Sequence, residues 1–142
     1  MMFSNVLVPT DGSDGAREAA AVAFELARQF DATVHALFVI DGRVIDGEFD
    51  FAVEAAEVTA ENALDAVGEL GADYGIDVQK HLRRGTPYDE IIRAIDAHGI
   101  DHVVMGTHGR TGFDRIVNLG SVTERVVRMA PVPVTTVPIG SR

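Results

Sequence analysis

The stretch Val6-Leu7-Val8-Pro9-Thr10-Asp11-Gly12-Ser13 (residues 6–13) decides the fold class. Its apolar first half predicts a short buried strand, and Thr10-Asp11-Gly12 predicts a turn. Ser13 or Asp14 then supplies a side-chain oxygen that can cap a helix, and apolar residues recur at helical spacing over residues 15–30. A strand that passes through a tight turn into an amphipathic helix is the repeating unit of α/β proteins.

The same unit recurs along the rest of the chain. Apolar runs predict strands at residues 33–40, 77–82, 102–105 and 132–137. Stretches of helical period predict helices at residues 52–74, from Pro87 onward and at 121–129, with a loop over 41–51. Strands that alternate with helices predict a parallel sheet covered on both faces, and therefore a single three-layer α/β/α domain over residues 1–142.

The last predicted strand has the character of an edge strand. Pro131, Pro133 and Pro138 lack the N–H group that a central strand donates. An apolar edge strand promotes aggregation unless something covers it. Pairing of Val132–Val137 with the same strand of a second copy would cover it, which makes a homodimer our hypothesis.

The amino-acid composition limits the classes of binding partner and indicates the cellular compartment. The net charge is -10, which disfavours nucleic acid and anionic membranes as partners. Cysteine is absent, no apolar run reaches the roughly 20 residues of a membrane helix, and the N-terminus lacks a signal-peptide pattern, so we expect a cytoplasmic protein. Lys80 is the only lysine. A lysine-poor acidic surface favours a salt-rich (halophilic) cytoplasm, with an ordinary acidic domain as the alternative.

A glycine-rich segment after the fourth predicted strand is typical of a phosphate site. Gly106, Gly109 and Gly112 allow the backbone to approach a ligand closely. Gly120-Ser121 opens the last helix, where free N–H groups and the helix dipole favour an anion, and Ser121 and Thr123 add hydroxyl donors. A triphosphate could bridge these two elements. The P-loop and dinucleotide motifs are both absent.

Six motifs, in order along the whole chain, resemble those of the universal stress protein family. They are 6–13 (VLVPTDGS), 37–41 (LFVID), 85–87 (GTP), 104–112 (VMGTHGRTG), 120–126 (GSVTERV) and 132–134 (VPV). The resemblance implies a Rossmann-like five-stranded parallel sheet of order 3-2-1-4-5, a dimer through the last strand, and ATP binding in one branch of the family.

The resemblance also implies roles for individual residues. Gly106 and Gly109 would contact ribose and phosphate, and Gly120, Ser121 and Val122 would hold the phosphates. The remaining contacts would place Pro9, Thr10 and Asp11 around the adenosine, the backbone of Val39 at the adenine edge, and Met105 against the base. Asp11 has an alternative role as a cap of its own turn.

Ten residues separate Gly109 from Gly120, where the family pattern has nine. The extra residue could form a bulge or could weaken triphosphate binding. Three hypotheses therefore stay open: an ATP-binding stress-response module with an unknown protein partner, a weak ATPase, and a nucleotide-independent dimeric module. Catalysis would need a charge clamp and an acid–base pair, and the sequence shows no lysine near the site.

The other polar candidates have competing interpretations. His108 and Arg110 complete the candidate nucleotide-binding set, His108 through its backbone and Arg110 as a phosphate counter-charge or a surface residue. Asp41 and Asp46 could position Mg²⁺ with ATP or could simply be solvated. No metal site of the protein itself is predicted, because the spacing of His35, His81, His98 and His102 is not that of metal ligands.

Overall fold

The computed structural model describes residues 3–42, 50–107 and 120–138, and strands alternate with helices throughout these ranges. In chain order the elements are β1 (Asn5–Pro9), α1 (Asp14–Phe30), β2 (Thr33–Asp41), α2 (Asp50–Asp73), β3 (Val78–Gly85), α3 (Pro87–Ala97), β4 (His102–Gly106), α4 (Ser121–Met129) and β5 (Val134–Val137). The predicted alternation of strands and helices is confirmed.

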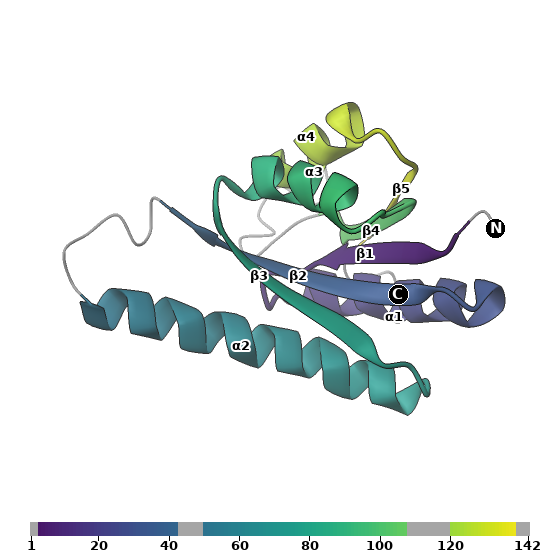
Figure 1. Ribbon diagram of the computed structural model, residues 1–142, viewed down its shortest axis with the longest axis horizontal. Coiled ribbons are helices and arrows are strands. Elements are labelled where there is room, and N and C mark those ends of the chain that lie inside the picture. Colours follow the sequence, from purple (N-terminus) through teal and green to yellow (C-terminus); the bar gives the residue numbers. More distant parts are fainter. Residues whose placement is uncertain (1–2, 43–49, 108–119, 139–142) are drawn as a thin grey trace.

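All five strands form one parallel sheet in the order β3-β2-β1-β4-β5 (Figure 1). The order confirms the predicted topology and places β5 at one edge. The chain reverses its winding direction between β1 and β4, so the loops after these two strands diverge. Such a switch point is where open α/β sheets hold their ligands.

The helices cover both faces of the sheet (Figure 1). Helices α1 and α2 lie on one face, and α3 and α4 lie on the other. The core of the first face is built mainly from alanine and valine around the fully buried Phe24. The core of the second face includes Leu7, Leu37 and Ile95. The buried residues of α1 and α3 recur at helical spacing, as their sequences predict.

Several element boundaries differ from the predictions. Strand β3 continues to Gly85 instead of Leu82, because Arg83 and Arg84 occupy an edge strand where charged side chains reach solvent. Strand β5 begins at Val134 instead of Val132, since Pro133 cannot donate to the ladder. The predicted loop over 41–51 was wrong at its ends, which belong to β2 and α2; residues 43–49 lie outside the described ranges.

Glycine sets the end of α2. Gly75 has a φ of +71°, a left-handed conformation that side chains disfavour. The N–H of Gly75 donates to the carbonyl of Ala72, and the N–H of Ile76 donates to the carbonyl of Gly71. These two bonds form a Schellman cap, as the sequence predicts for Gly75, and they turn the chain directly into β3.

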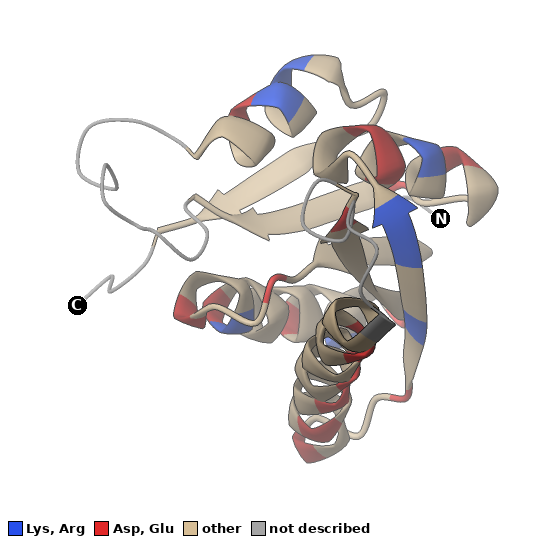
Figure 2. Cartoon of the chain, turned by 90° about the vertical axis from the view of Figure 1, so that its left-hand side faces the viewer, with Lys and Arg blue, Asp and Glu red and all other residues tan. Residues whose placement is uncertain are grey.

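Acidic side chains recur along α2, whereas arginines gather at the end of β3 (Figure 2). Lys80 pairs with Asp65 at 3.1 Å, and Arg84 pairs with Glu57 at 2.9 Å, so β3 is tied to α2 by exposed ion pairs. Within the three described ranges, no helix has the length and apolar character needed to span a bilayer.

Candidate functional site

A cavity of about 410 Å³ opens at the carboxyl ends of β1, β2 and β4. Strands β1 and β4 are direct neighbours in the sheet, so Pro9 and Gly106 at their carboxyl ends border the same cavity. The amino-terminal ends of α3 and α4 form the opposite side. The cavity therefore lies at the topological switch point.

Ten of the thirteen candidate nucleotide-binding residues line this cavity. They are Pro9, Thr10, Asp11, Val39, Met105, Gly106, Gly120, Ser121, Val122 and Thr123. The other three, His108, Gly109 and Arg110, lie outside the described residues. The structure thus brings together candidates that are more than 100 positions apart in the chain.

One part of the cavity wall is apolar. Leu37 and Ile91 are buried in the core beneath it, and Met105 is 6% exposed. Val39 and Pro87 extend this wall. Flat apolar surface of this kind can accept the face of a heterocyclic base.

Another part of the wall is the start of α4, where backbone donors are available. Gly120 is the N-cap residue and provides no side-chain cap. Among the described residues, the N–H groups of Ser121, Val122 and Thr123 have no hydrogen-bond acceptor. The first turn of a helix concentrates such donors and carries positive partial charge, so this end of the cavity favours an anion.

The start of α1 differs from the start of α4, because side chains of its own turn accept three of the backbone donors there. Gly12 N–H donates to the Thr10 hydroxyl at 3.1 Å, Ser13 N–H to Asp11 Oδ1 at 2.9 Å, and Ala16 N–H to Ser13 Oγ at 3.2 Å. A second cavity of about 290 Å³ borders this turn between α1 and α2. Since Ser13 caps α1 with its side chain and no side chain caps α4, the cavity at α4 is the better anion site.

Asp11 and Thr123 have structural roles as well as places in the cavity wall. Asp11 caps its own turn through Ser13 N–H, which is the alternative role that the sequence left open. The Thr123 hydroxyl, expected to donate to a ligand, instead donates to the carbonyl of Gly106 at 2.9 Å. The remaining donor of Thr123 toward the cavity is its backbone N–H.

Gly106 lies where the end of β4 approaches the start of α1. A Cβ atom at Gly106 would lie 2.9 Å from the backbone carbon and oxygen of Gly15. A glycine at this position is therefore required by packing, independently of any ligand.

Comparison with known proteins identifies the family. The model of the universal stress protein family matches residues 2–138. The chain belongs to this family. It is 36% identical over 141 residues to universal stress protein MJ0531 of Methanocaldococcus jannaschii, covering 96% of this chain and 82% of that protein.

Solved universal stress proteins share the fold. The structure of MJ0577 from the same organism superposes with a TM-score of 0.83 at 31% identity and covers 96% of both chains. The universal stress protein of Archaeoglobus fulgidus, solved in complex with dAMP, superposes with a TM-score of 0.74 at 23% identity, covering 96% of this chain and 98% of that one. This second likeness shows the fold alone.

Six further residues line the cavity of this universal stress protein; none was in the candidate nucleotide-binding set, although Asp41 was a candidate to position Mg²⁺. They are Ser13, Ala16, Leu37, Asp41, Pro87 and Ile91. Alternation along β2 could have indicated Leu37 and Asp41, because both are two positions from Val39 and share its face. No sequence signal indicates that the start of α3 packs against this wall.

The spacing of the histidines along the chain did not predict a cluster, but three of them meet in the structure. His35, His81 and His98 form a cluster whose ligating nitrogens all lie within 4.8 Å of one another. His102 lies elsewhere and contacts the Thr135 hydroxyl through Nε2 at 2.8 Å. The cluster is separate from the cavity and is considered below.

Proposed function

We propose that this universal stress protein binds an adenine nucleotide, ATP, in the cavity at the switch point of its sheet. One observation carries the proposal: an apolar wall borders the same cavity as three N–H groups of α4 that have no acceptor within the described part of the chain. The base would lie against Met105 and Val39, and the phosphates would extend toward Ser121 and Val122. The cavity volume lies within the roughly 300–1,000 Å³ of small-ligand sites.

The dAMP complex of the Archaeoglobus fulgidus protein supports this choice of ligand, because it shows that a chain of this fold accommodates an adenine nucleotide. His108, Gly109 and Arg110 belong to the proposal as further contacts to the phosphates. Asp11 and Asp41 both line the cavity, and carboxylate oxygens are ligands that suit the Mg²⁺ delivered with ATP.

We infer that ATP is bound rather than turned over rapidly. Phosphoryl transfer requires positive charge placed against the γ-phosphate. The only lysine, Lys80, is on β3 and is paired with Asp65 on the other face of the sheet. A regulatory role follows, in which ATP stabilises the conformation that it binds and a protein partner detects that conformation.

Thermal unfolding with and without ATP and Mg²⁺ tests this function. We expect the Tm to rise as ATP increases to millimolar concentration, because a ligand that binds only the folded state stabilises it. The measurement should be made from low to molar KCl, since an acidic surface suits the salt-rich cytoplasm that we propose. An unchanged Tm across this range would reject nucleotide binding.

Extraction of small molecules from the purified protein separates the remaining hypotheses. ATP or AMP identified by mass spectrometry would exclude a nucleotide-independent module. Steady ATP hydrolysis that disappears in Asp11→Ala would instead favour the weak ATPase.

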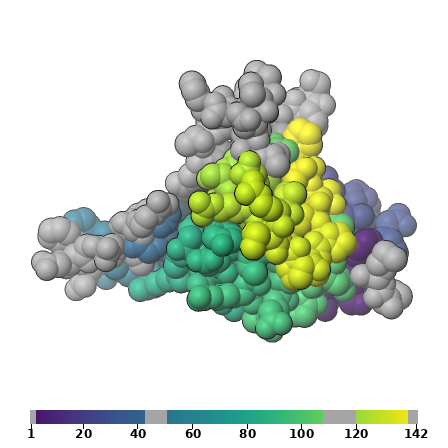
Figure 3. Space-filling view, turned by 90° about the horizontal axis from the view of Figure 1, so that it is seen from above, coloured from purple at the N-terminus to yellow at the C-terminus, as the bar shows by residue number. Residues whose placement is uncertain are grey.

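We further propose that the protein is a homodimer through β5. This strand pairs only with β4 among the described residues and lies beside α4 at the rim of the sheet (Figure 3). Val127 and Met129 of α4 are 44% and 57% exposed. Pairing with a second copy would cover the open edge, and a monomeric mass in sedimentation at all concentrations would overturn this proposal.

A further inference from the structure

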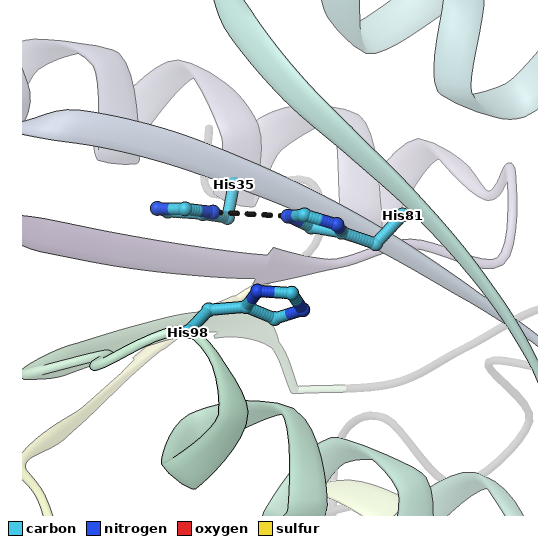
Figure 4. A group of neighbouring side chains, drawn as sticks. All are labelled: His35, His81 and His98. Atoms are coloured by element: carbon cyan, nitrogen blue, oxygen red, sulfur yellow. Dashed lines mark hydrogen bonds between the residues drawn. The ribbon is translucent and has the colours of Figure 1, made fainter.

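Three histidines from distant parts of the chain meet beside the sheet, on the face covered by α3 (Figure 4). His35 is on β2, His81 is on β3, and His98 is the residue that ends α3. His35 Nδ1 lies 3.0 Å from His81 Nε2, and the rings of His81 and His98 stack with centroids 3.9 Å apart. The cluster lies at the end of α3 opposite to Pro87, which lines the nucleotide cavity.

Asn5 fixes which nitrogen of His35 carries the hydrogen. The side-chain oxygen of Asn5 lies 3.0 Å from His35 Nε2. An amide oxygen can only accept, so Nε2 is the protonated nitrogen and Nδ1 directs its lone pair toward His81. A histidine that binds a metal through one nitrogen and donates from the other to an oxygen has this same arrangement.

His35 and His81 are also in the neutral form that metal binding requires. Burial, and then the proximity of His98, lower the pKa of His35. Burial, and then the proximity of His98, His35 and Arg83, lower the pKa of His81 to about 4. Both rings are therefore neutral at pH 7, with lone pairs available for coordination.

We propose that His35, His81 and His98 bind a divalent transition-metal ion of the zinc type, with water as the fourth ligand. The group contains three imidazoles and no carboxylate, a donor set that suits Zn²⁺, Co²⁺, Ni²⁺ or Cu²⁺ and disfavours Mg²⁺ and Ca²⁺. Nitrogens around a tetrahedral Zn²⁺ lie about 3.3 Å apart, given Zn–N bonds of about 2.0 Å.

Binding requires only a small rearrangement of the empty cluster. The nitrogens lie within 4.8 Å of one another, so no pair must approach by more than about 1.5 Å to reach the separation around bound Zn²⁺. His35 Nδ1 and His81 Nε2, at 3.0 Å, are already that close. The stacked rings of His81 and His98 must also turn so that both lone pairs point at one ion. Torsions next to an imidazole ring have broad preferences, which makes this rotation easy. Without metal, the contact between His35 and His81 holds the rings in place.

Titration of metal-free, tag-free protein with Zn²⁺ and Co²⁺ tests the site. Excess Mg²⁺ should be present to occupy acidic surface groups. We expect one Zn²⁺ per chain, a rise in Tm, and with Co²⁺ the visible absorption of a tetrahedral ion. Asn5→Ala should weaken Zn²⁺ binding on the order of 10-fold, because Asn5 orients the ligand His35 and the loss of such an outer-shell partner has that effect. Histidines that merely pack together would not give this result.

His98→Ala and His81→Ala should each weaken binding by at least about 100-fold. His98 ends a helix and is only half-buried, so its replacement should leave the fold intact. His102→Gln is the matched control, since it removes a histidine outside the cluster, and it should bind Zn²⁺ like the wild type. Absence of stoichiometric binding, or equal binding by wild type and His98→Ala, would overturn the proposal.

Discussion

The hydroxyl of Thr123 donates a hydrogen bond of 2.9 Å to the carbonyl oxygen of Gly106 and so joins the start of α4 to the end of β4. Thr123 is only 5% exposed. A second hydrogen bond joins the same two segments: the N–H of Gly120 donates to the carbonyl of Thr107 at 2.7 Å. These bonds hold the backbone donors of α4 over the carboxyl end of the sheet.

Thr123→Val should lower the free energy of unfolding by about 1–2 kcal/mol, because it removes the hydroxyl that donates to the half-buried Gly106 carbonyl. Urea unfolding measures this change. Thr123→Ser keeps the hydroxyl, so its free energy of unfolding should fall by less. Equal stability of Thr123→Val and the wild type would show that the bond contributes nothing.

Gly106→Ala should destabilise the fold by roughly 1–3 kcal/mol, as expected where an added methyl group forces the backbone to move. The new Cβ would lie 2.9 Å from the backbone of Gly15, which cannot turn aside as a side chain can. Gly42→Ala is the matched control, since its Cβ would meet only an ordinary contact of 3.9 Å at Gly85. The prediction fails if the two variants unfold at the same urea concentration.

Ser121→Pro tests the proposed phosphate contact with the backbone. Ser121 is the first residue of α4, a position that proline tolerates, and Gly120 already has the extended φ of -60° and ψ of 153° that precede proline. The helix should persist while one N–H donor is lost. We expect ATP binding to weaken about 10-fold or more, the effect of losing a charge-assisted hydrogen bond.

Ser121→Ala is the control for this substitution, because it removes the hydroxyl and keeps the N–H. Calorimetric titration with ATP should show the larger loss in Ser121→Pro. If both variants bind ATP as the wild type does, the phosphates lie elsewhere.

Glu90→Ala should cost roughly 1–3 kcal/mol, because the half-buried Arg83 loses a charge-assisted hydrogen bond. Glu90 is 8% exposed and accepts from Arg83 at 3.2 Å and Arg93 at 3.1 Å. Arg93 is largely exposed, so Arg93→Ala should change stability by less than about 1 kcal/mol. Thermal or urea unfolding of both variants checks this ranking, and a reversed order would contradict it.

His102 should make the protein less stable in mild acid. Burial lowers the pKa of His102, and Asp101 opposes this effect only in part. The unfolded chain therefore takes up this proton first as the pH falls below 6.5, which favours unfolding; above pH 6.5 both states are neutral. The Nδ1 atom is buried without a partner among the described residues, so the charged ring gains no compensating bond there.

Free energies of unfolding between pH 7 and 5, measured with EDTA present, should fall less steeply for His102→Gln than for the wild type. The other histidines remain in both proteins, so the difference in slope belongs to His102. Parallel curves would show that its pKa is the same in the folded and unfolded chains.

The strand–helix order, the sheet order and most of the cavity wall could be predicted from the sequence. Short loops such as residues 10–13 follow strands directly, so their place at the sheet's carboxyl edge is set by topology. The histidine cluster could not be predicted, because the β2–β3 register and the end of α3 bring His35, His81 and His98 together. The spacing of these histidines along the sequence indicates neither the strand register nor the position of the end of α3.

The hydroxyl of Thr123 illustrates a second limit. Its residue type indicates a donor, but only the packing of α4 against β4 shows that the donor is already used. The same is true of Gly106, whose packing against Gly15 depends on how α1 approaches β4.

The single lysine makes the edge strand β3 open to selective chemistry. Lys80 projects beside α2 with its side chain 42% exposed, and a protease specific for lysine has only the bond after this residue to cleave. Extended chain within a sheet resists cleavage until it detaches, so the digestion rate would report the opening of β3 alone. A dye directed to the same amine would provide a fluorescent marker at that edge, one residue before His81 of the proposed metal site.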